Sequence, residues 1–229
     1  MTTGGATIGG AARPARHVVW DWNGTLLDDN HAVVAAVNSV CAGFGRPSVT
    51  LEQWREVFSR PLVACYERLL ERPLSAEDWA TLDALYHDEY RNLLDTCRLA
   101  DGVPDRLHDW RAAGNTQSLL SMWFHHELVP LVTEFGLADL FDRIDGLRVD
   151  TGGGSKAEHL AEHLTQLRLD PADVVLVGDV VDDGHAAEQV GAACVLVSTG
   201  VTNRATLEAT GLPVADSIPA ALTLINRMS

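Results

Sequence analysis

Aspartates that directly follow short apolar runs are the residues of this sequence most suited to chemistry. Asp21 follows the bulky run 18–20, and an Asn-Gly turn stops that run. Asp179 follows the apolar run 174–177 in the same way, after Gly178. Open α/β sheets bind ligands at the carboxyl ends of their parallel strands. Both carboxylates are therefore predicted at a ligand-binding edge, although an aspartate there can also simply cap a turn.

The sequence around Asp179 is rich in carboxylates and predicts a cation site. Asp182 and Asp183 follow closely, and neither lysine nor arginine stands beside them. Burial penalises charged carboxylates, so a cluster at a buried strand end needs a cation. A small number of oxygen ligands favours Mg²⁺, which keeps several waters and accepts a substrate phosphate. Either Asp182 or Asp183 could join Asp179 as a ligand.

Lys156, the only lysine of the chain, stands where the local electrostatics disfavour a cation. Ser155 and Glu158 form a capping box, which places Lys156 in the first turn of a helix. The helix macrodipole opposes a positive charge in that turn, and a residue that breaks a local rule invites a functional explanation. A lysine beside helix N-terminal N–H groups suits a phosphoryl group in transit. The alternative is a solvated surface lysine.

Two hydroxyl groups and one arginine complete the set of candidate ligands. Thr25 follows the first turn, and Ser121 follows the predicted strand 116–120. A lone serine after a strand is usually a helix cap or a turn residue, so Ser121 has weight only together with the other motifs. Arg60, in a Ser-Arg-Pro turn, is predicted to reach an anionic substrate.

Strands and helices alternate in the segments that must position these residues. The predicted strands are 18–20, 116–120, 144–149, 174–177 and 194–197. The predicted helices around them are 104–113, 124–135, 156–168, 183–190 and 219–227. This alternation predicts an α/β fold, a parallel Rossmann-like sheet core covered by helices on both faces.

Residues 31–98 are predicted to form an all-α cap inserted into that core. Residues 28–30 can cap a first helix over 31–42, and Thr50 with Gln53 forms a capping box for a second. Further helices are predicted over 61–71 and from Ser75 to about Cys97. The domain prediction is therefore a flexible tail over 1–16, a core over 17–30 and 99–229, and the cap between them.

The order of these motifs resembles that of haloacid dehalogenase (HAD)-like hydrolases, in the branch similar to phosphoglycolate phosphatases. The run Asp21-Trp-Asn23-Gly-Thr25 resembles their first motif, whose usual form is Asp-x-Asp-Gly-Thr. Ser121 matches the second motif, Lys156 the third, and the spacing of Asp179 and Asp183 the fourth. The resemblance covers the core at both ends of the chain, whereas residues 31–98 match only as a helical cap.

The resemblance implies a role for each of these residues. Asp21 would be the nucleophile that becomes an aspartyl phosphate. Thr25, Ser121 and Lys156 would bind the phosphoryl group, with Lys156 also acting in catalysis. The metal ligands would be Asp21, the Asn23 backbone carbonyl, Asp179 and Asp183.

Asn23 is the departure from the usual motif. In the family that the sequence resembles, the aspartate usually found there protonates the leaving group and then activates water, and such acid/base help is typically worth about 10²–10⁴ in rate. Asn23 keeps the carbonyl but cannot carry the proton. Three explanations stay open: a histidine replaces it, with His31, His125 and His126 as candidates; the substrate has an acidic leaving group; or the protein binds a phosphorylated ligand with little or no turnover.

Composition limits the partners. The net charge of −15 and the pI near 4.8 argue against nucleic acid and anionic membranes. The four cysteines are widely spaced and predicted to be reduced in a cytoplasmic protein. A lysine-dependent phosphonate hydrolase is disfavoured because the cap contains no lysine.

The leading hypothesis is a Mg²⁺-dependent phosphatase that hydrolyses a small phosphorylated metabolite as a monomer or homodimer. The alternative is a weakly active or inactive phospho-ligand-binding or regulatory protein on the same fold. Asn23→Asp is expected to raise a weak activity if the rest of the site is intact.

Overall fold

The computed structural model describes residues 17–148 and 154–228, so the predicted tail over 1–16 lies outside the described residues. These residues form a six-stranded parallel sheet in the order β5-β4-β1-β6-β7-β8. Its strands are β1 (His17–Trp20), β4 (Thr116–Phe124), β5 (Ile144–Leu147), β6 (Val174–Gly178), β7 (Ala193–Val197) and β8 (Val214–Ala215). Every residue of β1 and β6 is buried, as expected of central strands covered on both faces.

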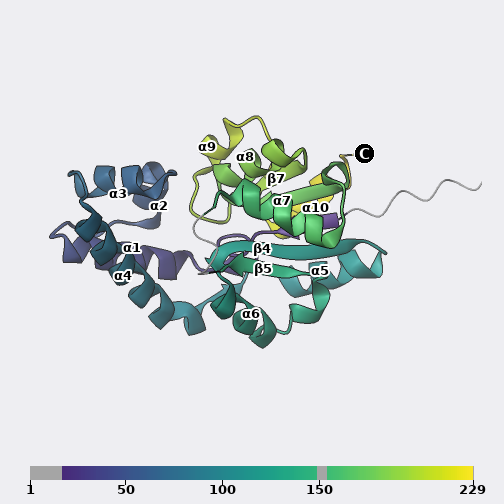
Figure 1. The fold of residues 1–229 in the computed structure, drawn as a ribbon, viewed down its shortest axis with the longest axis horizontal. Helices are drawn as coiled ribbons and strands as arrows, with labels where there is room; N and C mark the ends of the chain where they lie inside the picture. Colours follow the sequence, from purple (N-terminus) through teal and green to yellow (C-terminus); the bar gives the residue numbers. More distant parts are fainter. Residues whose placement is uncertain (1–16, 149–153, 229) are drawn as a thin grey trace, which may run out of the picture.

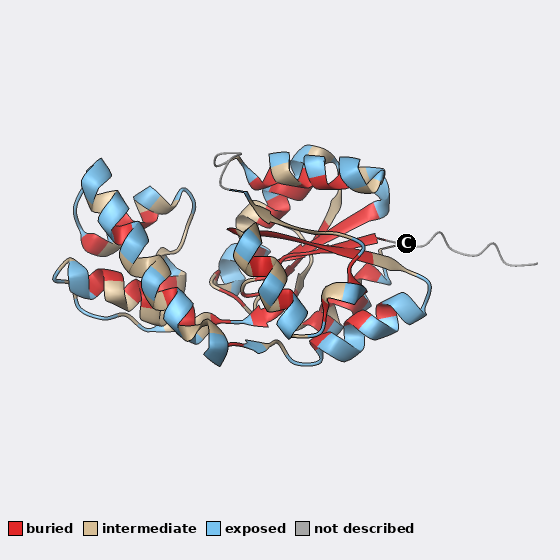
Figure 2. Ribbon diagram, turned by 60° about the horizontal axis from the view of Figure 1, so that its bottom comes forward, coloured by how far each residue is buried: buried red, intermediate tan, exposed pale blue. Residues whose placement is uncertain are grey.

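Helices cover both faces of this sheet, and alternate side chains of β1 divide the core between them. Val18 and Trp20 pack in the cluster that includes α5 (Val103–Ala112), α6 (His125–Glu134) and α10 (Ile218–Ile225). Val19 points to the opposite face. There it packs with α7 (Lys156–Leu167), α8 (Val181–Val190) and α9 (Arg204–Glu208). Figure 1 shows the two helical layers, and Figure 2 shows the buried sheet between them. The predicted α/β fold is confirmed.

Four helices form a separate lobe beside the sheet (Figure 1). They are α1 (Asn30–Gly43), α2 (Leu51–Val57), α3 (Leu62–Leu70) and α4 (Ala76–Leu93). The chain enters and leaves this lobe through the antiparallel pair β2 (Leu27–Asp28) and β3 (Arg98–Leu99). The capping box predicted at Thr50 is present, and Ser75 forms another one with Asp78 at the start of α4. We refer to this lobe as the cap.

Two sequence predictions about local structure were wrong. The predicted strand over 116–120 is longer, because β4 continues to Phe124 and pairs again with β5 beyond a register shift. Asp29 stands at the N-cap of α1, but its side chain makes no capping hydrogen bond because other donors occupy it.

The short strands β2, β3 and β8 carry too few residues to show a periodic pattern. Within the described residues, no helix is long and apolar enough to cross a membrane.

Candidate active site

The predicted site residues meet at the carboxyl edge of the sheet. Asp21 follows β1, Asp179 follows β6, Ser121 lies in β4, and Lys156 begins α7. All four side chains are buried and line one cavity of about 340 Å³ between the core and the cap. Strands that run in parallel end at the same edge, which explains why residues so distant in sequence converge here.

Three carboxylates cluster at the base of this cavity, and two of them pair with Lys156. Asp21, Asp179 and Asp183 each place an oxygen within 4.8 Å of the others. The Lys156 ammonium donates to Asp21 Oδ1 at 2.5 Å and forms an ion pair with Asp183. The local rule that Lys156 breaks at its helix start is thus explained by the carboxylates in front of it. The charges do not balance, and oxygen donors in this arrangement fit a divalent cation such as Mg²⁺.

Burial and mutual repulsion shift the pKa values of these groups. Burial raises the pKa of Asp21 to about 6, although Lys156 opposes the shift and Asp183 reinforces it. Burial, Asp21 and Asp183 raise the pKa of Asp179 well above its ordinary value. For Lys156, burial lowers the pKa, but Asp183 and Asp21 more than offset it and the pKa lies above the ordinary value. A bound cation would favour the ionised carboxylates.

Asp179 sits in a tight cradle of backbone. The Val201 N–H donates to Asp179 Oδ2 at 2.9 Å. Gly24 and Gly200 lie so close that a Cβ on either would overlap the Asp179 carboxylate. These glycines therefore fix where the carboxylate points.

Gly200→Ala is expected to raise the Mg²⁺ concentration for half-maximal activity by about 10-fold, because displacing a metal ligand's support typically costs 10- to 100-fold in affinity. The measurement is phosphate release against Mg²⁺ concentration. Gly43→Ala is the matched control, since its Cβ would meet only the end of the flexible Leu85 side chain in the cap. An unchanged Mg²⁺ requirement in Gly200→Ala would show that the cradle does not position Asp179.

Asp182 and Asp183 point to different places, which bears on the alternative left open above. Asp183 is fully buried in the carboxylate cluster, and its Oδ2 accepts from the Val180 N–H at 3.0 Å. Asp182 instead pairs with Arg60 of the cap, with 3.3 Å between Arg60 Nε and Asp182 Oδ2. The geometry favours Asp183 as the ligand. Arg60 lines the cavity, and its guanidinium already pairs with a carboxylate.

The side chain of Asn23 is held by Asp29 and Tyr90, and neither contact was predicted. Asn23 Nδ2 donates to Asp29 Oδ2 at 3.0 Å and to the Tyr90 hydroxyl at 2.7 Å. The Tyr90 hydroxyl donates to the same Asp29 oxygen at 2.5 Å, and the Gly24 N–H donates to the other at 2.9 Å. Burial raises the pKa of Asp29, and these donors oppose the shift. The carboxyl group of Asp29 thus lies beside Asn23.

The hydroxyl groups of Thr25 and Ser121 have contacts near Asp21. Thr25 Oγ1 donates to Asp21 Oδ2 at 3.4 Å. Ser121 Oγ lies 3.4 Å from Asn23 Oδ1 and accepts from the Trp123 N–H at 3.0 Å. Both groups can therefore orient the site without a phosphate present.

The three histidines proposed to replace the missing aspartate lie elsewhere. Of the described residues that line the cavity, none is His31, His125 or His126; the histidine there is His87. His31 lies 2.8 Å from the Thr96 hydroxyl, and His125 Nδ1 accepts from a backbone N–H. The explanation that one of them carries the proton has no geometric support.

Asn23→Asp alone is expected to lower the free energy of unfolding by about 1–3 kcal/mol, because it replaces the donor to buried Asp29 with a second carboxylate. The double variant Asn23→Asp/Asp29→Asn restores an amide beside a carboxyl group and should recover most of that loss. Urea denaturation of the two single variants and the double variant forms a double-mutant cycle. Additive effects would contradict the direct coupling. The activity gain expected of Asn23→Asp should therefore be sought in the double variant.

Comparison with known proteins places this arrangement in a family. Residues 18–197 match the haloacid dehalogenase-like hydrolase family. The chain is 28% identical to phosphoglycolate phosphatase 1 of Pseudomonas aeruginosa over 216 residues, 91% of this chain and 76% of that relative. It is 27% identical to a tyrosine-protein kinase of Mycobacterium tuberculosis over 183 residues, 80% of this chain and 62% of that relative. A solved structure of a predicted phosphatase from Clostridium acetobutylicum shares the fold, with a TM-score of 0.81 and 18% identity over 93% of this chain and 99% of that chain.

The chain belongs to the haloacid dehalogenase-like hydrolase family. It is an enzyme of that family, and the resemblance predicted from the four motifs is confirmed. The two relatives named above have different activities at almost equal identity. Similarity alone therefore does not select the substrate of this chain.

Proposed function

We propose that this chain is a Mg²⁺-dependent phosphatase that hydrolyses a small phosphate monoester through an aspartyl phosphate on Asp21. One observation supports it. At the carboxyl edge of the sheet and the base of the cavity, next to Ser121, the structure brings together Asp21, Asp179, Asp183 and Lys156. Bound Mg²⁺, held by the three carboxylates and the Asn23 carbonyl, would neutralise charge on the phosphoryl oxygens.

Each protein group has a part in this reaction. Asp21 attacks phosphorus, and Thr25 holds its carboxylate. Lys156 and Ser121 bind the phosphoryl oxygens while the charge on them is spread over the transition state. The cap over residues 31–98 covers the cavity and keeps bulk water from the site. We also propose that the protein acts in the cytoplasm on a small metabolite, as a monomer or homodimer.

The test is release of inorganic phosphate from sugar phosphates, phosphoglycolate, nucleotides and acyl phosphates, with and without Mg²⁺. Asp21→Asn protein serves as the blank. Release that requires both Mg²⁺ and Asp21 is the expected result. If folded protein that binds Mg²⁺ releases no phosphate from any of these substrates, the proposal is overturned and a phospho-ligand-binding protein is favoured.

A further inference from the structure

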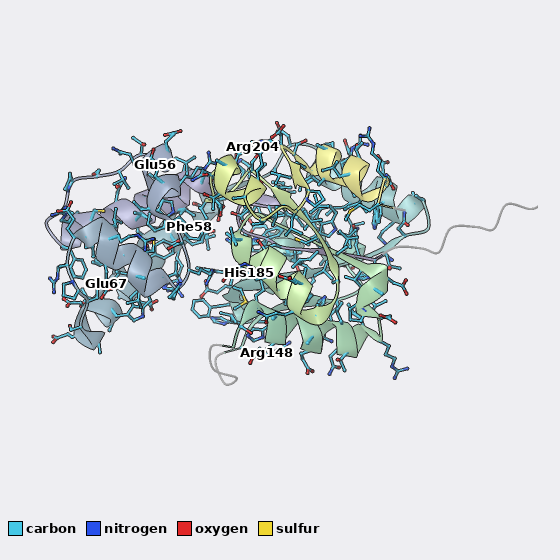
Figure 3. The ribbon with its side chains drawn as sticks, turned by 90° about the horizontal axis from the view of Figure 1, so that it is seen from above. Glu56, Phe58, Glu67, Arg148, His185 and Arg204 are labelled. Carbon is cyan, nitrogen blue, oxygen red and sulfur yellow. The ribbon has the colours of Figure 1, made fainter. Side chains whose placement is uncertain are left out.

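Seven aromatic side chains line the cavity. The cap contributes Trp54, Phe58, Tyr66, Trp79, Tyr86 and Tyr90, and the core adds Trp123. Several of these rings pack on one another, as in Tyr86 stacked on Tyr90 with centroids 6.0 Å apart. Figure 3 shows Phe58 on the side of the cap that faces the core. A volume of about 340 Å³ is within the range of small-molecule pockets, roughly 300–1,000 Å³.

The arginine and the lysine that line this cavity in the described part of the chain already have carboxylate partners. Arg60 pairs with Asp182, and Lys156 pairs with Asp21 and Asp183. His87 Nδ1 lies 3.4 Å from a carboxylate oxygen of Asp83, which also lines the cavity. A substrate with a carboxylate or second phosphate next to its ester would bring an additional negative charge among these acidic groups. The cavity therefore suits a leaving group that is flat, apolar and without negative charge.

Asn23 gives an independent indication of the leaving group. The Asn23 amide supplies no acid, and both oxygens of the neighbouring Asp29 carboxylate accept hydrogen bonds from Asn23, Gly24 and Tyr90. The departing oxygen therefore leaves as an anion or takes its proton from solvent. A phenol has a pKa of about 10, as in tyrosine, whereas that of water, to which simple alcohols are close, is about 15.7. An aryloxide is by far the better unassisted leaving group, so it depends least on the missing aspartate.

We propose that the substrate is an aryl phosphate monoester whose uncharged ring binds in the aromatic cavity of the cap. This proposal rests on the phosphatase activity proposed above. Asp21 Oδ forms a bond to phosphorus as the bond from phosphorus to the aryl oxygen breaks, and the electron pair stays on that oxygen. The aryloxide then takes a proton from solvent. Water attacks the aspartyl phosphate, releases inorganic phosphate and regenerates the Asp21 carboxylate.

Four substrates separate the effect of an aromatic ring, which the cavity favours, from that of an acidic leaving group, which Asn23 favours. Phenyl phosphate has an aromatic ring and an acidic leaving group, benzyl phosphate has the ring alone, acetyl phosphate has the acidity alone, and phosphoglycolate has neither. We expect the highest kcat/KM for phenyl phosphate, about 100-fold or more above benzyl phosphate, since missing acid help typically costs 10²–10⁴. A kcat/KM for benzyl phosphate equal to that for phenyl phosphate would overturn the inference drawn from Asn23. Acetyl phosphate or phosphoglycolate as the best substrate would overturn the argument from the cavity.

A pair of matched variants tests whether the ring binds in the cap. Phe58 lines the cavity and packs on Trp54, with ring centroids 5.6 Å apart, while Phe44 is an equally half-buried cap residue that lies under Arg72 instead. Phe58→Leu should raise KM for phenyl phosphate by about 2- to 10-fold, the range of a lost aromatic contact, and leave KM for acetyl phosphate unchanged. Phe44→Leu should change neither. Equal effects of Phe58→Leu on both substrates would contradict ring binding.

The substrates that release phosphate distinguish a wrong aryl substrate from a wrong phosphatase function. Activity on acetyl phosphate or phosphoglycolate that requires Asp21 and Mg²⁺, without preference for phenyl phosphate, leaves the phosphatase in place and removes the aryl substrate. Absence of phosphate release from all four substrates removes the aryl substrate, and absence of release from the sugar phosphates and nucleotides as well overturns both.

Discussion

Asp21→Asn should abolish phosphate release and leave the fold intact. The amide cannot attack phosphorus, and loss of a nucleophile in a hydrolase has cost about 10⁶ in kcat where it has been measured; we expect at least about 10⁴. The substitution conserves shape and removes one negative charge from the cluster of three carboxylates that Lys156 alone compensates in part. Stability should therefore be unchanged or slightly higher. Phosphate release and thermal unfolding followed by circular dichroism measure both effects.

The control for Asp21→Asn is the same substitution at an exposed aspartate. Asp173 is exposed and lies at the amino end of β6, the edge of the sheet away from the cavity. Asp173→Asn should keep full activity. Trapping supplies a second readout, because wild-type protein quenched in acid should carry phosphate on Asp21 and the variant should carry none. Appreciable turnover by folded Asp21→Asn would remove Asp21 as the nucleophile.

The sequence predicted the parts of this site that depend on position along the chain. Asp21, Asp179 and Lys156 each stand at a strand end or helix start, and the geometry of parallel sheets brings such positions together. Lys156 was informative because it violates the helix-dipole rule, and the structure supplies the two carboxylates that account for it. Local rules are therefore most useful where a residue breaks them.

Contacts between distant segments were not predictable in the same way. Tyr90, near the C-terminal end of α4, contacts Asn23 and Asp29, which lie 67 and 61 residues earlier in the chain, and no spacing in the sequence predicts these contacts. Asp29 was interpreted as a helix cap because aspartate before a helix usually is one. Its carboxylate instead satisfies donors at the site, since a buried carboxylate takes the partners that best offset its desolvation. The choice between Asp182 and Asp183 likewise depended on the position of Arg60.

Lys156→Met should both inactivate the enzyme and make its stability depend on Mg²⁺. Methionine keeps the apolar stem but removes the charge that compensates Asp21 and Asp183. Breaking a buried ion pair typically costs 3–5 kcal/mol because a charge is left uncompensated. We expect a loss of about that size in EDTA, and a fall in kcat of about 10²–10³ for a missing phosphoryl ligand.

Mg²⁺ should restore much of the stability of Lys156→Met without restoring its activity, because the cation can neutralise the carboxylates but cannot replace the ammonium beside the phosphoryl group. Urea denaturation in EDTA and in Mg²⁺ measures this difference. Arg204→Met is the control, since Arg204 forms an exposed pair with Glu208 and such pairs contribute about 0–1 kcal/mol. Lys156→Met protein as stable as wild type in EDTA would show that the carboxylates need no compensating charge. Protonation of Asp21, whose pKa burial already raises to about 6, would then be the means by which the folded cluster avoids repulsion.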